Sequence, residues 1–219
     1  MRFQRLLIEG KLGTLTCFVS NSRNDFFGLS AFHVLRGNDN RVDDEEIIKI
    51  LNHTGRWVNF GKTKYGEYNT GQGQYGNFGK LDYGIFELHP SFKRRISNRL
   101  TPLMTSSLFQ FDNLEHILGT RVQAYSEENQ NWIYGEIVDI HHKFNSTKLF
   151  DVLIRMDLGT RTYEGDSGML WRDEYGDALF MHTNRHNVSG FHYSYGTIIS
   201  RIITPNNLTL IQVNEKLFA

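Results

Sequence analysis

Cysteine is almost absent from the sequence, since the 219 residues contain only Cys17. A single cysteine cannot form an internal disulfide bond. A chain of this length buries roughly 70% of the surface that it exposes when unfolded, so it needs no disulfide or metal to hold its core. Long apolar runs are also missing, and none approaches the roughly 20 residues that cross a bilayer. We therefore expect a protein of a reducing compartment without a transmembrane helix.

A secretory signal and an excess of charge are missing as well. In the opening residues, MRFQRLLIEGKLG, Glu9 and Lys11 stand where the apolar core of a signal peptide would have to continue. The 24 Lys and Arg residues balance the 24 Asp and Glu residues. Nucleic-acid-binding proteins usually carry a basic excess or a basic stripe, and here only the short segment FKRRISNR (92–99) approaches one. We expect a cytoplasmic location, no membrane association and no nucleic-acid partner.

What the sequence does contain is a series of short segments with alternating apolar and polar residues. This pattern, bounded by Gly, Asn and Asp, is typical of β-strands, and many short strands with turns between them indicate an all-β sandwich or barrel. The last residues, NNLTLIQVNEKLFA, look helical instead, with Asn206 or Asn207 as the N-cap. The strand candidates are 14–20, 26–32, 57–62, 83–88, 120–126, 132–140, 150–156, 168–173, 178–183 and 195–200.

The strand candidates fall into two groups, separated by a charged stretch with few strand signals. We expect two β domains, 1–95 and 119–219, joined by a connector over 96–118. The glycine- and tyrosine-rich tract 61–80 predicts a long hairpin or a flap, because such polar sequence cannot bury a core. Segment 42–51 fits either a short helix or a loop that leads into a strand.

The segment TYEGDSGMLW (162–171) places Ser167 between an aspartate and a glycine. An Asp-Ser pair bounded by glycines is common in turns, so this motif alone does not show a nucleophile. A serine nucleophile also needs a base, an acid that orients the base, and donors for the developing oxyanion. The best base candidate is His33 in GLSAFHVLRG, and the best acid candidate is Asp82 at the start of DYGIFEL. Taken singly, each of these two residues also fits a structural role.

His33 and Asp82 belong to the first strand group and Ser167 to the second, so the three would meet in a cleft between two domains, where ligand sites commonly form. The segments LSAFHVL, LDYGIFEL and EGDSGMLW resemble the histidine, aspartate and serine segments of trypsin-like serine proteases, in particular the compact, disulfide-free bacterial type. Segment 118–140 resembles the opening strands of that family's second barrel. The resemblance implies the chymotrypsin fold, which is all-β with two six-stranded antiparallel β-barrels, here with a short C-terminal helix.

The resemblance also implies a mechanism. Ser167 would be the nucleophile, His33 its general base and then the general acid, and Asp82 the group that orients the imidazole. The backbone N–H groups of Gly165 and Ser167 would form the oxyanion hole. The implied function is a serine endopeptidase that cleaves peptide bonds through an acyl-enzyme and needs no cofactor.

The specificity pocket is marked less clearly. By the resemblance, Arg161 and Thr162 stand near the floor of the primary pocket, and His182 with Thr183 lies in ALFMHTN, which resembles a strand of glutamyl endopeptidases and of viral proteases that prefer glutamine. Donors from an arginine and a histidine would suit an acidic or amide side chain, because a guanidinium binds a carboxylate bidentately. We expect a protein or peptide substrate, narrow specificity, and an acidic residue or Gln at P1, the position before the scissile bond.

Several alternatives stay open. In digestive relatives the counterpart of Asp166 pairs with an N-terminus released by cleavage, and no activation site is evident here. Asp166 must therefore bond another group, and the enzyme is either active as made or switched on by a bound partner. Other hypotheses are a catalytically silent protease-fold binding module and an esterase or acyl-transferase with the same triad. No metal site is expected, because the histidines lack cysteine or carboxylate neighbours at the spacing of zinc ligands.

Overall fold

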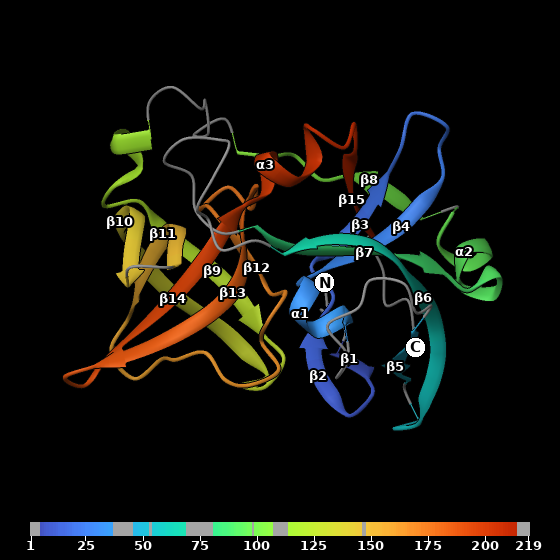
Figure 1. Ribbon diagram of the computed structural model, residues 1–219, viewed down its shortest axis with the longest axis horizontal. Helices are drawn as coiled ribbons and strands as arrows, with labels where there is room; N and C mark the ends of the chain where they lie inside the picture. Colours follow the sequence, from blue (N-terminus) through green and yellow to red (C-terminus); the bar gives the residue numbers. More distant parts are fainter. Residues whose placement is uncertain are drawn as a thin grey trace.

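The computed structural model describes residues 5–36, 46–52, 54–68, 81–97, 99–106, 114–145 and 148–213. These residues form mainly antiparallel β-strands, arranged as two units that lie side by side (Figure 1). A nine-stranded sheet takes up most of the N-terminal half, and a closed six-stranded barrel lies in the C-terminal half. The all-β class predicted from the alternating pattern is confirmed.

The nine-stranded sheet draws strands from both ends of the chain. Its order is β2-β1-β5-β6-β7-β4-β3-β15-β8. β7 lies between β6 and β4 and is buried along almost its whole length, so its first residue, Asp82, is held inside the protein. The strands are β1 (Arg5–Ile8), β2 (Lys11–Thr14), β3 (Cys17–Ser20), β4 (Phe26–Ser30), β5 (Ile47–Leu51), β6 (Trp57–Tyr68), β7 (Asp82–Leu88), β8 (Leu100–Pro102) and β15 (Thr209–Val213).

The six-stranded barrel closes in the order β10-β11-β14-β13-β12-β9. Along β9, every second residue is buried, as expected for a strand with one face toward a barrel core. Trp171 and Phe180 are fully buried and fill the interior. The strands are β9 (Arg121–Ser126), β10 (Asn131–Asn145), β11 (Lys148–Met156), β12 (Leu170–Arg172), β13 (Ala178–Val188) and β14 (Phe191–Ile198).

The described helices are short. α1 (Phe32–Leu35) follows β4 directly and carries His33, and α2 (Pro90–Ile96) occupies the basic segment that follows β7. The others are the 3-10 helix η1 (Leu114–Ile117) and α3 (Ile199–Ile203). Within the described ranges, none of the helices has the length and apolar character needed to cross a bilayer.

The helix predicted for the last residues is wrong where the structure describes them. Residues Thr209–Val213 form β15, which pairs with β3 on one side and with β8 on the other. The β-branched Thr209 and Ile211 suit a strand, and pairing on both sides satisfies the backbone groups that a helix would have satisfied internally. The short helix near this end of the chain is α3, and residues 214–219 lie outside the described residues.

Two ambiguous tracts are described in part. Residues 47–51 form β5, so the strand alternative holds there, whereas 42–45 lie outside the described residues. β6 runs through the first part of the glycine- and tyrosine-rich tract, and 69–80 lie outside. In the expected connector, β8 adds a strand to the N-terminal sheet and η1 leads toward the barrel.

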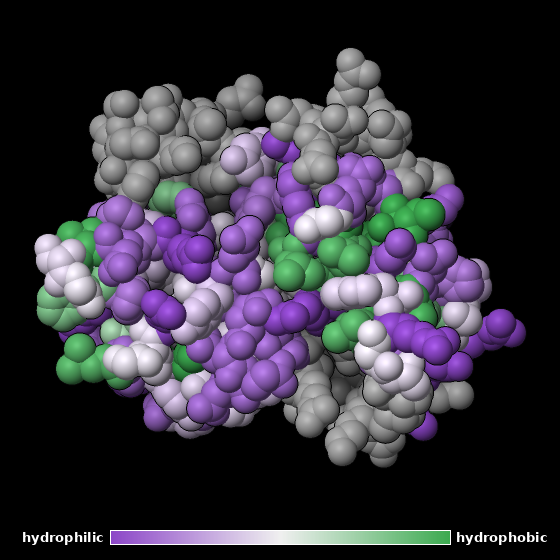
Figure 2. Space-filling model, turned by 90° about the horizontal axis from the view of Figure 1, so that it is seen from below, coloured by the Kyte–Doolittle hydropathy of each residue, from purple (hydrophilic) through white to green (hydrophobic). Residues whose placement is uncertain are grey.

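The two β units are joined by apolar packing. The core of the N-terminal sheet includes Leu170, Met181 and Ile199 from the C-terminal half of the chain. A second core, around Trp171 and Phe180, fills the barrel. Seen from below, hydrophilic side chains cover the middle of the surface, while hydrophobic ones lie to the right, over the N-terminal unit, and at the left edge (Figure 2). The shared core fixes how the units face each other, and this determines the shape of the site between them.

We predict that the leucine of β15 contributes to stability as a core strand residue. Leu210 is 1% exposed and lies in the core of the N-terminal sheet. Leu210→Ala should lower the free energy of unfolding by about 2–5 kcal/mol, because it leaves a cavity. Leu158→Ala is the control, since Leu158 is 90% exposed and its loss should change stability by less than about 0.5 kcal/mol. Urea denaturation measures both values, and equal small effects would contradict the burial of β15.

Candidate active site

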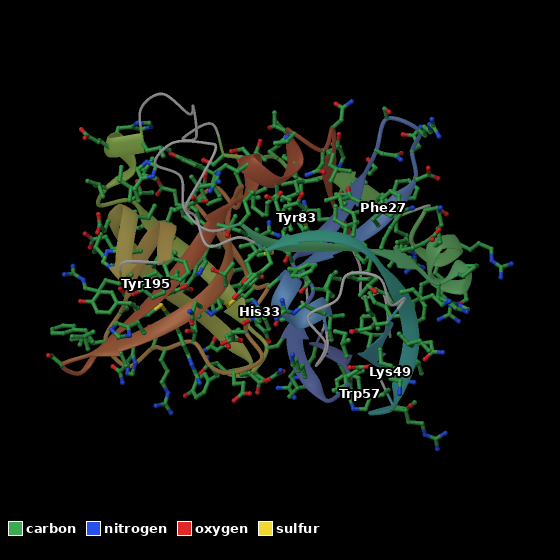
Figure 3. All side chains as sticks on the ribbon, viewed as in Figure 1. Phe27, His33, Lys49, Trp57, Tyr83 and Tyr195 are labelled. Carbon is green, nitrogen blue, oxygen red and sulfur yellow. The ribbon has the colours of Figure 1, made fainter. Side chains whose placement is uncertain are left out.

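His33 lies at the junction of the two β units (Figure 3). The strand pattern of β4 ends at Ser30, and the chain then forms the single helical turn α1, whose buried Phe32, Val34 and Leu35 anchor it in the core. His33 is left partly exposed, with 34% of its side chain accessible. The sequence placed this histidine where a strand meets a turn, and the structure shows that arrangement.

Asp82 holds both the backbone and the ring of His33. Its carboxylate accepts a hydrogen bond from the His33 backbone N–H at 3.1 Å, and its other oxygen lies 2.7 Å from His33 Nδ1. Only 1% of the Asp82 side chain is exposed. When Nδ1–H donates to this carboxylate, Nε2 carries the free lone pair of the neutral imidazole. The arrangement fixes the orientation and the tautomer of His33.

Ser167 lies on a tight turn that depends on its glycines. Gly165 and Gly168 have φ values of +100° and +95°, a conformation that side chains with a Cβ rarely adopt. A Cβ on Gly168 would lie 2.1 Å from the carbonyl oxygen of Thr14, so that position has no room for another residue. The glycines on both sides of the Asp-Ser pair are therefore required by this turn and by its closeness to the other β unit.

Thr14, at the end of β2, bonds the serine turn to the N-terminal unit. The Thr14 backbone N–H donates to the carbonyl of Ser167 at 2.8 Å, and its hydroxyl donates to the carbonyl of Gly165 at 2.8 Å. The Ser30 hydroxyl in turn donates to the Thr14 carbonyl at 2.8 Å. Ser30 ends the strand that leads into α1, so these bonds connect the segment of Ser167 with that of His33. They brace the serine turn without a disulfide bond.

The backbone N–H groups of Gly165 and Ser167 donate no hydrogen bond to any described part of the chain. The carbonyl oxygens of both residues are used by Thr14, which restrains how the turn can rotate. Two restrained, unused donors next to a serine hydroxyl are the arrangement that an oxyanion requires.

A groove of about 510 Å³ contains His33 and Ser167 together. His182 and Thr183, both expected from the sequence, line it as well. Thr162 is buried, and its carbonyl accepts a hydrogen bond from the groove residue Arg185. The groove is lined by Gly10, Lys11, Leu12, His33, Val34, Tyr163, Glu164, Gly165, Ser167, His182, Thr183, Asn184 and Arg185.

His182 is buried and uncharged at neutral pH. Burial lowers the pKa of its imidazole to about 3, with smaller contributions from His33 and Arg185. Its Nδ1 lies 2.7 Å from the Ser194 hydroxyl, which also accepts a hydrogen bond from the Trp171 indole at 3.0 Å. These contacts orient a neutral imidazole that is 1% exposed at the groove.

Arg161 does not line this groove. Its guanidinium lies 4.5 Å from the centre of the Tyr163 ring, and it borders another hollow, of about 320 Å³, together with Asp157 and Phe191. The arginine in the groove is Arg185, which sequence reasoning missed. A bulge in the pairing of β13 with β14, between His182 and Asn184, interrupts strict alternation there. Only the proximity of Arg185 to His182 in the sequence pointed to it.

Asp166 bonds neutral groups. Its carboxylate accepts hydrogen bonds from the Ser126 hydroxyl at 2.8 and 2.9 Å and from the Tyr163 backbone N–H at 2.8 Å. Asn129 also donates to the Ser126 oxygen, which ties the loop after β9 to the serine turn. The sequence required another partner for Asp166, and Ser126 is that partner. Among the described residues, no group of three or more His, Cys, Asp or Glu side chains is placed to hold a metal.

Solved proteases resemble this structure over nearly its whole length. A glutamic acid specific serine protease with a histidine triad in substrate binding aligns with a TM-score of 0.58 and 14% identity, over 94% of this chain and 97% of that chain. Thermobifida fusca protease A gives 0.57 and 12%, over 96% of each chain. Cellulomonas bogoriensis chymotrypsin gives 0.56 and 13%, over 95% and 96%. The chain has the chymotrypsin fold. No family model and no curated protein matches its sequence.

Asp166 is a buried carboxyl group bonded by neutral donors, and we predict a pH signature for it. Burial raises the pKa of Asp166 above its ordinary 3.8. A carboxyl whose pKa is raised on folding holds its proton more tightly in the folded state, so stability falls as the pH rises through the folded pKa. Relative to Asp166→Asn, the wild type should therefore gain stability as the pH is lowered from 7 toward 4.

Urea unfolding of both proteins at each pH measures this difference. Asp157→Asn is the control with the opposite sign, because the hydrogen bond from Arg121 lowers the pKa of Asp157. The wild type should lose stability relative to that variant as the pH falls. A difference between wild type and Asp166→Asn that does not change with pH would contradict the prediction.

Proposed function

We propose that this protein is a serine endopeptidase whose catalytic residues are Ser167, His33 and Asp82. The observation that carries the proposal is the pairing of His33 with buried Asp82 at the edge of the groove that also contains Ser167. The chymotrypsin fold supports it, because solved proteins with this fold and similar length are serine proteases. We infer a protein or peptide substrate cleaved with narrow specificity.

The proposed reaction uses His33 twice. His33 Nε2 takes the proton of the Ser167 hydroxyl while Oγ attacks the carbonyl carbon of the scissile bond. The C–N bond then breaks as the imidazolium returns that proton to the leaving amine, which leaves an acyl-enzyme on Ser167. Water hydrolyses the acyl-enzyme with the same proton transfers in the same order. Asp82 stabilises the imidazolium and keeps Nδ1 protonated.

The developing oxyanion would be bound by the N–H groups of Gly165 and Ser167. Losing one such donor typically costs about 2.7–4 kcal/mol of transition-state stabilisation. The bonds from Thr14 to the carbonyls of this turn, and those from Ser126 to Asp166, support a turn that is formed without a released N-terminus. This favours an enzyme that is active as made over one that waits for an activating partner.

His182 supports an acidic residue or Gln at P1. A neutral imidazole presents one N–H, which suits a carboxylate or an amide oxygen. A structural neighbour is a glutamic acid specific protease that uses a histidine triad in substrate binding. In this chain the contacts described behind His182 include the Ser194 hydroxyl and, through it, the Trp171 indole.

Labelling by a fluorophosphonate probe, read by intact mass, tests the proposed nucleophile. The wild type should gain one adduct, and Ser167→Ala should gain none, because only an activated serine reacts with the probe. For a peptide that the wild type cleaves, the rate of hydrolysis should fall by a factor on the order of 10⁴ in Asp82→Asn. This substitution keeps the geometry of the site but not the tautomer of His33. A folded wild-type protein that gains no adduct would support the silent binding module. If labelling then appears in lysate of the native host, the result supports a latent enzyme instead. Adducts without peptide hydrolysis would support an esterase or acyl-transferase.

A second prediction concerns the charge state of His182. Because its pKa is about 3, the imidazole stays neutral between pH 6 and 8, and a glutamate side chain stays ionised over that range. The ratio of kcat/KM for peptides with Glu and Gln at P1 should therefore stay constant within about twofold, while each value changes with the ionisation of the free enzyme. A ratio that rises tenfold toward pH 6 would show that a pocket histidine becomes charged.

A further inference from the structure

Arg185 is a cation in the groove without an acidic partner among the described residues. It lies on β13, three residues beyond His182, and its side chain is exposed. One Nη1–H donates to the Thr162 carbonyl at 3.3 Å, a long bond to a neutral acceptor. Within the described residues no carboxylate forms an ion pair with Arg185, although the guanidinium has five N–H donors.

Other groups that can carry a charge also line the groove. Besides His33 and His182, these are Lys11 and Glu164, one of each sign. His182 itself is neutral, since burial lowers its pKa to about 3, and the charge of Arg185 contributes to that lowering. Within the groove, the charges that act on His182 are those of His33 and Arg185, and of these two side chains only the guanidinium stays charged at every relevant pH.

A buried neutral imidazole by itself separates glutamate from glutamine poorly, because either side chain offers an oxygen that accepts its N–H. A guanidinium separates them, because it forms two parallel charged hydrogen bonds with a carboxylate and cannot do so with an amide. The weak bond between Arg185 and the Thr162 carbonyl is easily exchanged for such a pair. The glutamate side chain of the substrate then lies beside the N–H of the neutral His182 imidazole.

We propose that Arg185 is the residue that makes the groove select a glutamate side chain over glutamine at P1. The inference rests on the proposed endopeptidase function and names the substrate class of the same site. It assigns the guanidinium to Arg185 in place of Arg161, which faces a separate hollow. It also gives two residues of β13 different roles. His182 fits the shape of the P1 side chain, and Arg185 recognises its charge.

Kinetics with two end-blocked peptides that differ only in Glu or Gln at P1 test the proposal. Wild type should prefer Glu. Arg185→Gln should lower kcat/KM for the Glu peptide by roughly 10- to 100-fold and change that for the Gln peptide by less than about threefold, because only the charged contact is lost. Arg185→Lys keeps the charge without the bidentate geometry and should retain part of the preference. Arg161→Gln is the matched comparison and should leave the Glu-to-Gln ratio unchanged.

The inference is overturned if Arg185→Gln lowers both peptides equally or neither, if Arg161→Gln removes the preference instead, or if active wild type prefers Gln. In those cases the endopeptidase function stands. Binding of the same peptides to Ser167→Ala, measured by fluorescence anisotropy, needs no hydrolysis. Ser167→Ala should bind the Glu peptide more tightly than the Gln peptide, and the double variant Ser167→Ala/Arg185→Gln should lose that difference. This result supports the role of Arg185 even if the wild type neither hydrolyses the peptides nor reacts with the probe, so that the protease function fails. Equal binding of both peptides overturns it.

Discussion

The bonds that Thr14 makes to the serine turn are the constraint on which the site depends. Ser167 belongs to the C-terminal unit and His33, on α1, to the N-terminal unit, so neither unit alone contains the proposed nucleophile beside the proposed base. The Thr14 N–H and hydroxyl each hold a carbonyl of the turn at 2.8 Å, and Gly168 is required because Thr14 approaches so closely. The shared apolar core keeps the two units in this relation. A small shift of one unit would separate the groups that the proposed chemistry needs together.

Burial has a different consequence for each polar group at the site. Asp82 is buried but bonds the backbone and the ring of His33, so its desolvation is offset by charge-assisted hydrogen bonds. Asp166 is bonded only by neutral donors, which lower its pKa less than burial raises it. His182 has its charge suppressed by burial and becomes a neutral donor or acceptor. Arg185 remains in contact with solvent and keeps its charge, which suits it to meet a charged ligand.

Much of the fold followed from local patterns. Alternation predicted most strands of both units, and the glycines around Asp166 and Ser167 predicted a tight turn, because these signals depend on neighbouring residues only. The C-terminal segment was wrongly assigned to a helix because its apolar residues fit a helix as well as a strand. It forms a strand because it pairs with the edges of β3 and β8, which lie far away in the sequence. In the same way, which arginine lines the groove depends on the tertiary structure, which places Arg185 there and Arg161 at another hollow.

The sequence by itself determined the all-β class, the absence of any internal disulfide bond, and the three segments that carry His33, Asp82 and Ser167. Those properties reside in composition and in short stretches of chain, so they can be recognised without knowing where the stretches meet. Only the tertiary structure decided which carboxylate lies 2.7 Å from the His33 ring, what Asp166 bonds in the protein interior, and which arginine stands in the groove. These outcomes depend on contacts between residues far apart in the chain, where packing and desolvation, and not local propensity, set the free energy.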